Sequence, residues 1–126
     1  MSTKEYRVIV AGGRNFDDYN LLSATLDTAF GFVPKEDIAL ISGTARGADS
    51  LGEQWATERG IEVLRFPANW DTYGKSAGYR RNEEMAKAGN YLIAFWDGQS
   101  RGTQHMIGIA ARGGLHVTVI PYRGKV

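Results

Sequence analysis

A six-residue apolar run, Tyr91–Trp96, is followed at once by the polar loop Asp97–Thr103, which contains two glycines. The run is too short for a helix, and the residues after the loop are apolar at helical spacing, so this stretch predicts a strand, a loop and the beginning of a helix. The first turn of a helix carries unpaired backbone N–H groups and the positive end of the helix dipole. We therefore expect an anion to bind here, although glycine also serves in turns that bind nothing.

Similar units recur along the whole chain. Apolar runs that predict strands lie at residues 7–11, 38–41, 61–66, 91–96 and 117–120, and helical patterns lie at about 18–30, 48–59, 76–88 and 103–112. This alternation predicts an α/β fold with three layers, in which a five-stranded parallel sheet of order 3-2-1-4-5 carries helices on both faces. Ligands of such sheets bind where the strand order reverses, so the loops after the first and fourth strands should face each other.

Three finer expectations follow from the same patterns. The run at 61–66 alternates and is closed by a proline, which places it near an edge of the sheet. The helix at 103–112 is apolar nearly all round and should be well buried. The chain should form a single domain over residues 1–126, with a frayed tail from Pro121 to Val126.

Composition excludes several classes of site. The chain has no cysteine and only two histidines, so disulfides and thiolate catalysis are excluded, and neither a metal nor an intrinsic cofactor is expected. No segment approaches the roughly 20 apolar residues that cross a membrane, and the N-terminus lacks the apolar region of a signal peptide. A cytoplasmic protein without a membrane partner is expected.

The charge is small overall but uneven. The net charge is +1, and residues 1–66 hold seven Lys and Arg against ten Asp and Glu, whereas residues 67–126 hold eight against four. A large basic surface is therefore absent, and nucleic acid is expected to be an unlikely partner. The second half of the chain is the half that suits an anionic ligand.

Two polar loops other than Asp97–Thr103 are candidates for ligand contact. Gly12–Arg14 follows the first strand but does not match the glycine fingerprint of dinucleotide-binding proteins, which disfavours an NAD-dependent dehydrogenase. Ser42–Asp49 holds two glycines, two hydroxyls, a cation and a carboxylate within eight residues. Arginine suits bidentate phosphate binding, whereas a structural alternative is a helix cap with Arg46 paired to Asp49.

The beginning of the third helix carries an unusual cluster of cations. Lys75, Arg80 and Arg81 lie near a helix N-terminus, where the dipole favours acids, and an anionic ligand would compensate them. The alternative is a solvated face on which they pair with nearby glutamates. The aromatic residues Trp70 and Tyr73 of the preceding loop could stack on a base or pack the loop onto the domain.

The loops together resemble a known family over nearly the whole chain. The motifs that carry the resemblance are Gly12-Gly13-Arg14-x-Phe16, Ser42-Gly43-x-Ala45-Arg46-Gly47-x-Asp49, Pro67-Ala-x-Trp70-x-x-Tyr73-Gly74-Lys75-x-Ala77-Gly78-x-x-Arg81-Asn82-x-x-Met85 and Phe95-Trp96-Asp97-Gly98-x-Ser100-x-Gly102-Thr103. They look like the YspA-like branch of the SLOG superfamily. The resemblance implies a Rossmann-like fold that binds nucleotides or nucleotide-derived molecules.

Two other SLOG groups are similar to parts of the chain. Ser42–Asp49 is similar to a motif of the DNA-processing protein DprA (Smf), which binds single-stranded DNA. Arg81-x-x-x-Met85 and Gly98-x-x-x-Gly102-Thr103 are similar to signatures of LOG phosphoribohydrolases, which cleave the N-glycosidic bond of nucleoside monophosphates. The glutamate of that second signature falls on Met106, which cannot transfer a proton, so His105 or Asp97 would have to replace it.

The leading hypothesis is a protein that binds a nucleotide or nucleotide-derived small molecule, which would be its ligand rather than an intrinsic cofactor. The alternatives are an N-glycosidic hydrolase with Asp97 as its catalytic carboxylate, and a single-stranded nucleic-acid binder. Relatives of this kind often form dimers, so a homodimer is expected. The candidate ligand-binding residues are Gly12, Gly13, Arg14, Ser42, Gly43, Thr44, Arg46, Gly47, Asp49, Lys75, Arg81, Asn82, Gly98, Ser100, Gly102 and Thr103.

Overall fold

The computed structural model describes residues 3–123, in which five strands form one parallel sheet. The strands are β1 (Tyr6–Gly12), β2 (Ile38–Ser42), β3 (Glu62–Arg65), β4 (Tyr91–Trp96) and β5 (His116–Pro121). Their order is β3-β2-β1-β4-β5, and every neighbouring pair is parallel. The predicted fold class and strand order are confirmed.

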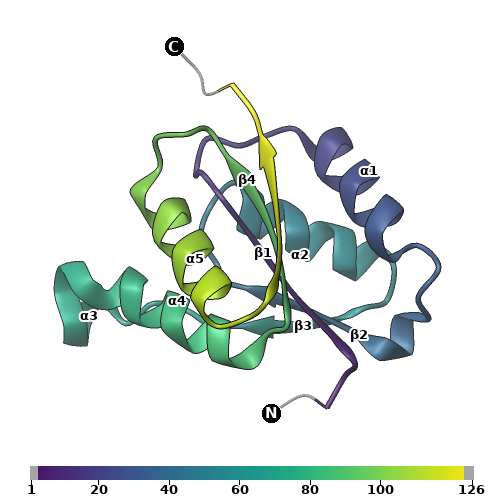
Figure 1. Cartoon of the computed structure of the whole chain (residues 1–126), viewed down its shortest axis with the longest axis horizontal. Helices are drawn as coiled ribbons and strands as arrows, with labels where there is room; N and C mark the ends of the chain where they lie inside the picture. The colour runs from purple at the N-terminus through teal and green to yellow at the C-terminus, as the bar shows by residue number, and fades with distance from the viewer. Residues whose placement is uncertain (1–2, 124–126) are drawn as a thin grey trace.

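The helices connect successive strands. They are α1 (Tyr19–Phe30), α2 (Ala48–Glu58), the short α3 (Trp70–Tyr73), α4 (Ala77–Ala88) and α5 (Arg101–Arg112), with 3-10 turns η1 (Lys35–Asp37) and η2 (Gly74–Ser76). The pair α1 and α2 lies on one side of the sheet and the pair α4 and α5 on the other, while α3 protrudes beyond α4 (Figure 1).

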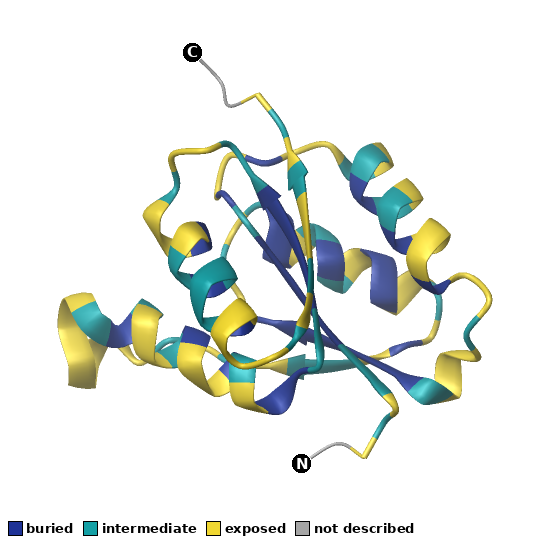
Figure 2. Cartoon of the chain, in the orientation of Figure 1, coloured by how far each residue is buried: buried dark blue, intermediate teal, exposed yellow. Residues whose placement is uncertain are grey.

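Alternation along β1 divides the core into two layers. Val8 and Val10 pack with residues of α1 and α2, and Ile9 and Ala11 pack with residues of α4 and α5. All four side chains are buried, as are most residues of the central strands (Figure 2). A parallel strand covered by helices on both faces needs apolar residues at every position, which explains why β1 lacks polar alternation.

Side-chain caps determine where two of the helices begin. The Asp18 carboxylate accepts a hydrogen bond from the Leu21 N–H at 3.0 Å and caps α1. The Ser100 hydroxyl caps α5 by accepting from the Thr103 N–H at 3.4 Å. Both caps satisfy backbone donors that the first helical turn leaves without partners.

The burial of α5 differs from the prediction. Only Thr103, Met106 and Ala110 are buried, whereas Ile107 and Ile109 are half-buried. The reason is that α5 contacts α4 and the sheet with one face, and no other element of residues 3–123 covers its outer side. The sequence pattern showed that α5 was apolar but not which of its faces had a partner.

The expected fraying of the tail is wrong for its first residues. Pro121 belongs to β5, and the Tyr122 N–H donates to the Trp96 carbonyl at 3.2 Å. The Tyr122 ring packs edge-on against Phe16, with 4.8 Å between ring centroids. Residues 124–126 lie outside the described part of the chain.

The predicted edge position of β3 is confirmed, and β5 forms the opposite edge.

No helix within residues 3–123 has the length and apolar character needed to cross a membrane.

Candidate functional site

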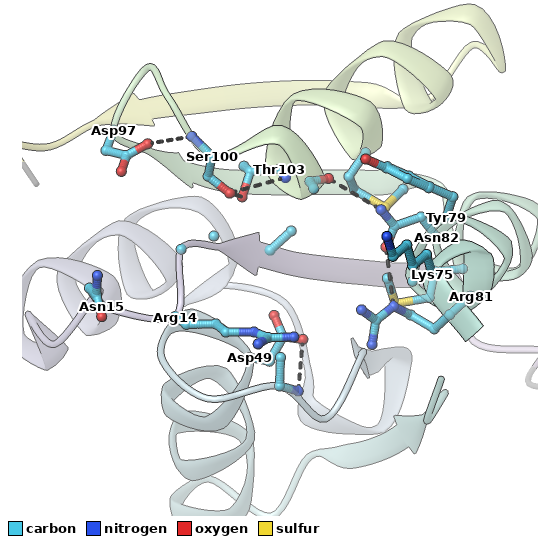
Figure 3. A pocket seen from close by; sticks show the side chains of 18 of the residues that line it. Arg14, Asn15, Asp49, Lys75, Tyr79, Arg81, Asn82, Asp97, Ser100 and Thr103 are labelled. Carbon is cyan, nitrogen blue, oxygen red and sulfur yellow. Dashed lines mark hydrogen bonds between the residues drawn. The ribbon is translucent and has the colours of Figure 1, made fainter. Parts of the chain in front are cut away.

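A cavity of about 450 Å³ opens at the carboxyl ends of β1 and β4, where the strand order reverses. Figure 3 shows side chains around it from the loop after β1, the beginning of α2, the beginning of α4 with the turn before it, and the loop leading into α5. The lining residues are Ala11, Gly12, Gly13, Arg14, Asn15, Ala45, Asp49, Trp70, Lys75, Gly78, Tyr79, Arg81, Asn82, Met85, Asp97, Ser100, Gly102, Thr103, Met106 and Tyr122. Parallel α/β sheets bind ligands at this position.

The N-terminus of α5 faces the cavity without a negative charge of its own. The first turn contains no acidic residue, and Ser100, Gly102 and Thr103 all line the cavity. A β-carbon on Gly102 would meet no atom within 4 Å, so the space beside the first turn is open. The backbone dipole and the hydroxyls of this turn can therefore bind an anion.

Asp97 is held in a turn just before α5. Its Oδ1 atom accepts hydrogen bonds from the N–H groups of Gln99 and Ser100 at 2.9 and 2.8 Å. The hydrogen bond from Ser100, followed by that from Gln99, lowers the pKa of Asp97 below its ordinary value. Asp97 is thus an ionised carboxylate at neutral pH, which can stabilise a positive charge but has no proton to donate.

Three cations line the cavity, and none of them forms an ion pair with another side chain of residues 3–123. Arg14 and Lys75 are exposed. Arg81 is half-buried, donates from Nη1 to the Gly43 carbonyl and from Nε to the Asn82 side-chain oxygen, and has its pKa lowered chiefly by burial. Cations gathered without carboxylate partners favour an anionic guest.

Asp49 lies in the wall of the cavity and is almost fully buried. Its Oδ2 atom accepts a hydrogen bond from the Ala45 N–H at 3.2 Å. Burial raises the pKa of Asp49 to about 6, although the Ala45 hydrogen bond and the charge of Arg81 oppose that rise. The carboxyl group therefore changes its charge under mildly acidic conditions.

The Ser42 hydroxyl of the Ser42–Asp49 loop binds partners within the protein. The Ser42 hydroxyl donates to Glu53 at 2.6 Å and accepts from the Thr44 N–H at 3.0 Å. Glu53 also pairs with Arg65 at 2.8 Å. The alternative of an Arg46–Asp49 ion pair is not found among residues 3–123.

The structure thus brings eleven of the predicted site residues to one cavity and leaves six outside its lining. The lining contains Gly12, Gly13, Arg14, Asp49, Lys75, Arg81, Asn82, Asp97, Ser100, Gly102 and Thr103. Outside it lie Ser42, Gly43, Thr44, Arg46, Gly47 and Gly98. Gly43 still supports the site through its carbonyl, which accepts from Arg81.

Asn82 joins the two helices that form one wall. Its side-chain nitrogen donates to the Gly102 carbonyl at 3.2 Å and lies 3.2 Å from the Nδ1 atom of His105. Asn82 is buried, so its amide positions α4 against the first turn of α5. His105 packs edge-on against Tyr79, with 4.6 Å between ring centroids, and burial lowers its pKa. His105 is outside the lining.

Sequence reasoning missed Tyr122 as a lining residue. Its hydroxyl lies so close to Gly13 that a β-carbon at that position would collide with it, and the same hydroxyl forms a hydrogen bond with the Gly13 backbone. A signal was present in the sequence, because an aromatic residue directly after the last strand lies at the same carboxyl edge as the loops. Asn15, Tyr79, Met85 and Met106 were also missed.

Residues 3–123 contain no group of three His, Asp or Glu side chains arranged to hold a metal ion.

Comparison with known proteins gives both sequence and structural relatives. The chain is 33% identical over 117 residues to the Gene 61 protein of Mycobacterium phage D29, with 88% of this chain and 93% of that protein covered. DprA from Streptococcus pneumoniae has a TM-score of 0.74 at 17% identity, over 93% of this chain and 50% of that one. DprA from Helicobacter pylori has a TM-score of 0.68 at 17% identity, over 95% of this chain and 67% of that one.

The expectation that nucleic acid is an unlikely partner must be corrected in this light. The structure of the Helicobacter pylori DprA describes how that protein binds single-stranded DNA, and its fold matches nearly the whole of this chain. Net charge was a poor guide, because a binding surface depends on where cations gather and not on their sum.

The family model described as YspA, cpYpsA-related SLOG family matches residues 6–73, more than half of the sequence. With this match and the phage relative, the chain belongs to the YspA, cpYpsA-related SLOG family.

Proposed function

We propose that the cavity binds a nucleotide or a nucleotide-derived small molecule. In this proposal the phosphate lies against the first turn of α5, beside Ser100 and Thr103, and the glycine loop after β1 closes the other side. The sugar and base extend toward α4. A volume of about 450 Å³ is within the range of cavities that hold small ligands.

One observation carries the proposal: Arg14, Lys75 and Arg81 converge on a cavity that also faces the N-terminus of α5, whose first turn has no acidic residue. No carboxylate within residues 3–123 forms an ion pair with these three cations. Asp49 and Asp97 also line the cavity, but within residues 3–123 neither forms an ion pair with the three cations. A phosphate would accept hydrogen bonds from the backbone and charge-assisted bonds from the arginines.

Isothermal titration against AMP, ADP-ribose, NAD and cyclic nucleotides tests the proposal. We expect micromolar or tighter binding of at least one of these compounds, weakened about tenfold or more in Arg14→Ala because one charged contact is lost. Arg46→Ala is the matched control, since Arg46 is exposed and lies outside the lining. Absence of binding across the panel would refute the proposal.

Single-stranded DNA is a second candidate guest, supported by the fold that this chain shares with the Helicobacter pylori DprA. A strand would place one of its nucleotides in the cavity and its other phosphates on the rim, near the exposed Lys75. Fluorescence anisotropy with a short labelled oligothymidylate distinguishes the two guests. Binding of DNA should fall steeply with salt, whereas binding of a mononucleotide should change far less.

A further inference from the structure

The rim of the cavity is rich in exposed aromatic side chains. Trp70 and Tyr79 both line the cavity, yet their exposed fractions are 50% and 41%. Trp70 begins the short helix α3, which protrudes beyond α4 (Figure 1), and Tyr79 lies in the first turns of α4. Large rings left in water beside a cavity commonly mark a contact surface.

Trp70 differs from the other two tryptophans of the chain. The indole N–H of Trp55 donates to Asp27 at 2.9 Å, and that of Trp96 donates to the Ser100 carbonyl at 3.1 Å, so both have a structural partner. The Trp70 indole has no hydrogen-bond partner among residues 3–123 and is the most exposed of the three. Unlike the indoles of Trp55 and Trp96, that of Trp70 is therefore not held by a hydrogen bond within residues 3–123.

Gly78 leaves room for the indole against α4. A β-carbon at Gly78 would lie 3.5 Å from the Cη2 atom of Trp70 and 3.8 Å from a guanidinium nitrogen of Arg81. The edge of the indole and the cation therefore border the same stretch of helix. An apolar ring next to an unpaired cation is the surface that a base attached to a phosphorylated sugar would need.

Tyr73 lies on the same short helix and provides a contrast. It is 45% exposed, but the Arg80 guanidinium covers its ring at 4.3 Å from the ring centroid, and Tyr73 is outside the lining of the cavity. Its aromatic face already has a cation–π partner within the protein. Of the two exposed rings of α3, only Trp70 is directed to the cavity.

We infer that Trp70 is the residue that stacks on the base of the ligand, with Tyr79 beside it on the same wall. This inference rests on the proposed function and makes it narrower: the guest is a base-bearing nucleotide unit, and a phosphorylated sugar alone is not sufficient. Stacking between a base and an aromatic side chain is tolerant of base identity, so Trp70 selects for the presence of a base.

The test compares ribose 5-phosphate with the 5′-monophosphates AMP, GMP, CMP and UMP by isothermal titration. We expect at least one monophosphate to bind about tenfold tighter than ribose 5-phosphate, because stacking adds to the phosphate contact. In Trp70→Leu this preference should disappear while the affinity for ribose 5-phosphate stays unchanged. Trp70→Phe should keep part of the preference, and Tyr73→Leu, the matched control, should keep all of it.

Tryptophan fluorescence gives an independent measurement. The emission should be quenched by the tighter monophosphate and not by ribose 5-phosphate, and the quenching should be absent in Trp70→Phe. Equal affinities for ribose 5-phosphate and all four monophosphates in the wild-type protein would overturn the inference and leave phosphate binding intact. Equal weakening of both ligands in Trp70→Leu would overturn it too, since Trp70 would then only support the fold. If none of the five compounds binds, the inference is overturned, and the proposed function fails as well if ADP-ribose, NAD and the cyclic nucleotides also do not bind.

Discussion

The N-termini of α2 and α5 both follow the carboxyl end of a strand, yet the two helices differ in whether an acidic residue lies at the positive end of the helix dipole. The first turn of α2 contains Asp49, which is buried and accepts a hydrogen bond from the loop before it. The first turn of α5 contains no acid, and its second residue, Gly102, borders open space. A helix N-terminus attracts negative charge. In α2 the carboxyl group of Asp49 occupies the first turn, whereas the first turn of α5 remains available to a ligand.

A dense polar motif is not by itself a ligand site. Ser42–Asp49 and Asp97–Thr103 each hold two hydroxyls, one cation and one carboxylate, so composition does not separate them. In the structure most of the groups of Ser42–Asp49 bind one another, Glu53 or Arg81. Hydroxyls and carboxylates close together in a chain can satisfy one another as readily as they can bind a ligand.

Substitution of two glycines with nearly equal positive φ angles should distinguish the beginning of α2 from that of α5 most strongly. Gly47 before α2 and Gly98 before α5 have φ angles of 82° and 83°. A β-carbon at Gly47 would collide with the Gly13 carbonyl, whereas at Gly98 it would meet nothing within 4 Å. We expect Gly47→Ala to lower the free energy of unfolding by about 3 kcal/mol or more, and Gly98→Ala by only about 1 kcal/mol. Urea denaturation measures both, and equal losses would show that the α2 junction is not tightly packed.

Asp49 should make stability depend on pH in a way that Asp97 does not. Its pKa of about 6 lies above the ordinary value of 3.8, so the folded protein holds the proton more tightly than the unfolded chain. The resulting stabilisation is complete below pH 3.8 and is lost as the pH rises through 6, by up to about 3 kcal/mol.

Asp49→Asn has no carboxyl group to ionise at this site. The free energy of unfolding of this variant, relative to that of the wild-type protein, should therefore increase between pH 4 and pH 7. Thermal unfolding across that range measures the difference. The control is Asp97→Asn: the pKa of Asp97 is lowered, so its contribution is present at neutral pH and is lost as the pH falls through its folded value. Parallel pH curves for Asp49→Asn and the wild type would contradict the burial of a titrating carboxyl group at this site.

Gly102→Asp would give α5 the acid that α2 already has. A β-carbon at Gly102 meets no atom within 4 Å, and an acid in the first turn favours the helix, so stability should not fall. The affinity for the tightest-binding nucleotide should decrease at least about tenfold, because the new carboxylate competes with the phosphate. Gly102→Ala, which adds volume without charge, should bind nearly as well as the wild type. Loss of affinity in Gly102→Ala would indicate a steric effect and not an electrostatic one.

The smallest effect on stability is expected from Asp97→Asn at neutral pH. Asparagine keeps an acceptor for the N–H groups of Gln99 and Ser100, so the change should be within about 0.5 kcal/mol. The hydrolase hypothesis predicts that the wild-type protein releases free base from a nucleoside monophosphate and that this variant does not. Chromatography of the reaction mixture detects the base. Release at the same rate in the variant would exclude Asp97 as the catalytic carboxylate.

Much of the architecture could be predicted because it depends on local patterns. The uninterrupted apolar runs of β1 and β2 and the cap of α1 are properties of short segments, and parallel topology follows from their alternation with helices. The sequence also predicted that Gly12–Arg14 and the loop before α5 lie close together, because adjacent parallel strands end at the same edge of a sheet. The exposed outer face of α5 could not be predicted, because apolar spacing does not reveal how many of a helix's faces have partners.

The sequence by itself determined the strand order and the edge at which a ligand should bind, because periodicity and short connections leave few alternatives for a chain of 126 residues. Tertiary structure alone decided which polar groups remain available there. It directed Ser42 to Glu53 and Arg81 to Gly43 and placed the Tyr122 hydroxyl beside Gly13. It also placed the Trp70 indole next to Gly78 with no hydrogen-bond partner among residues 3–123. These outcomes depend on distances between segments that are far apart in the chain, and no local pattern encodes such distances.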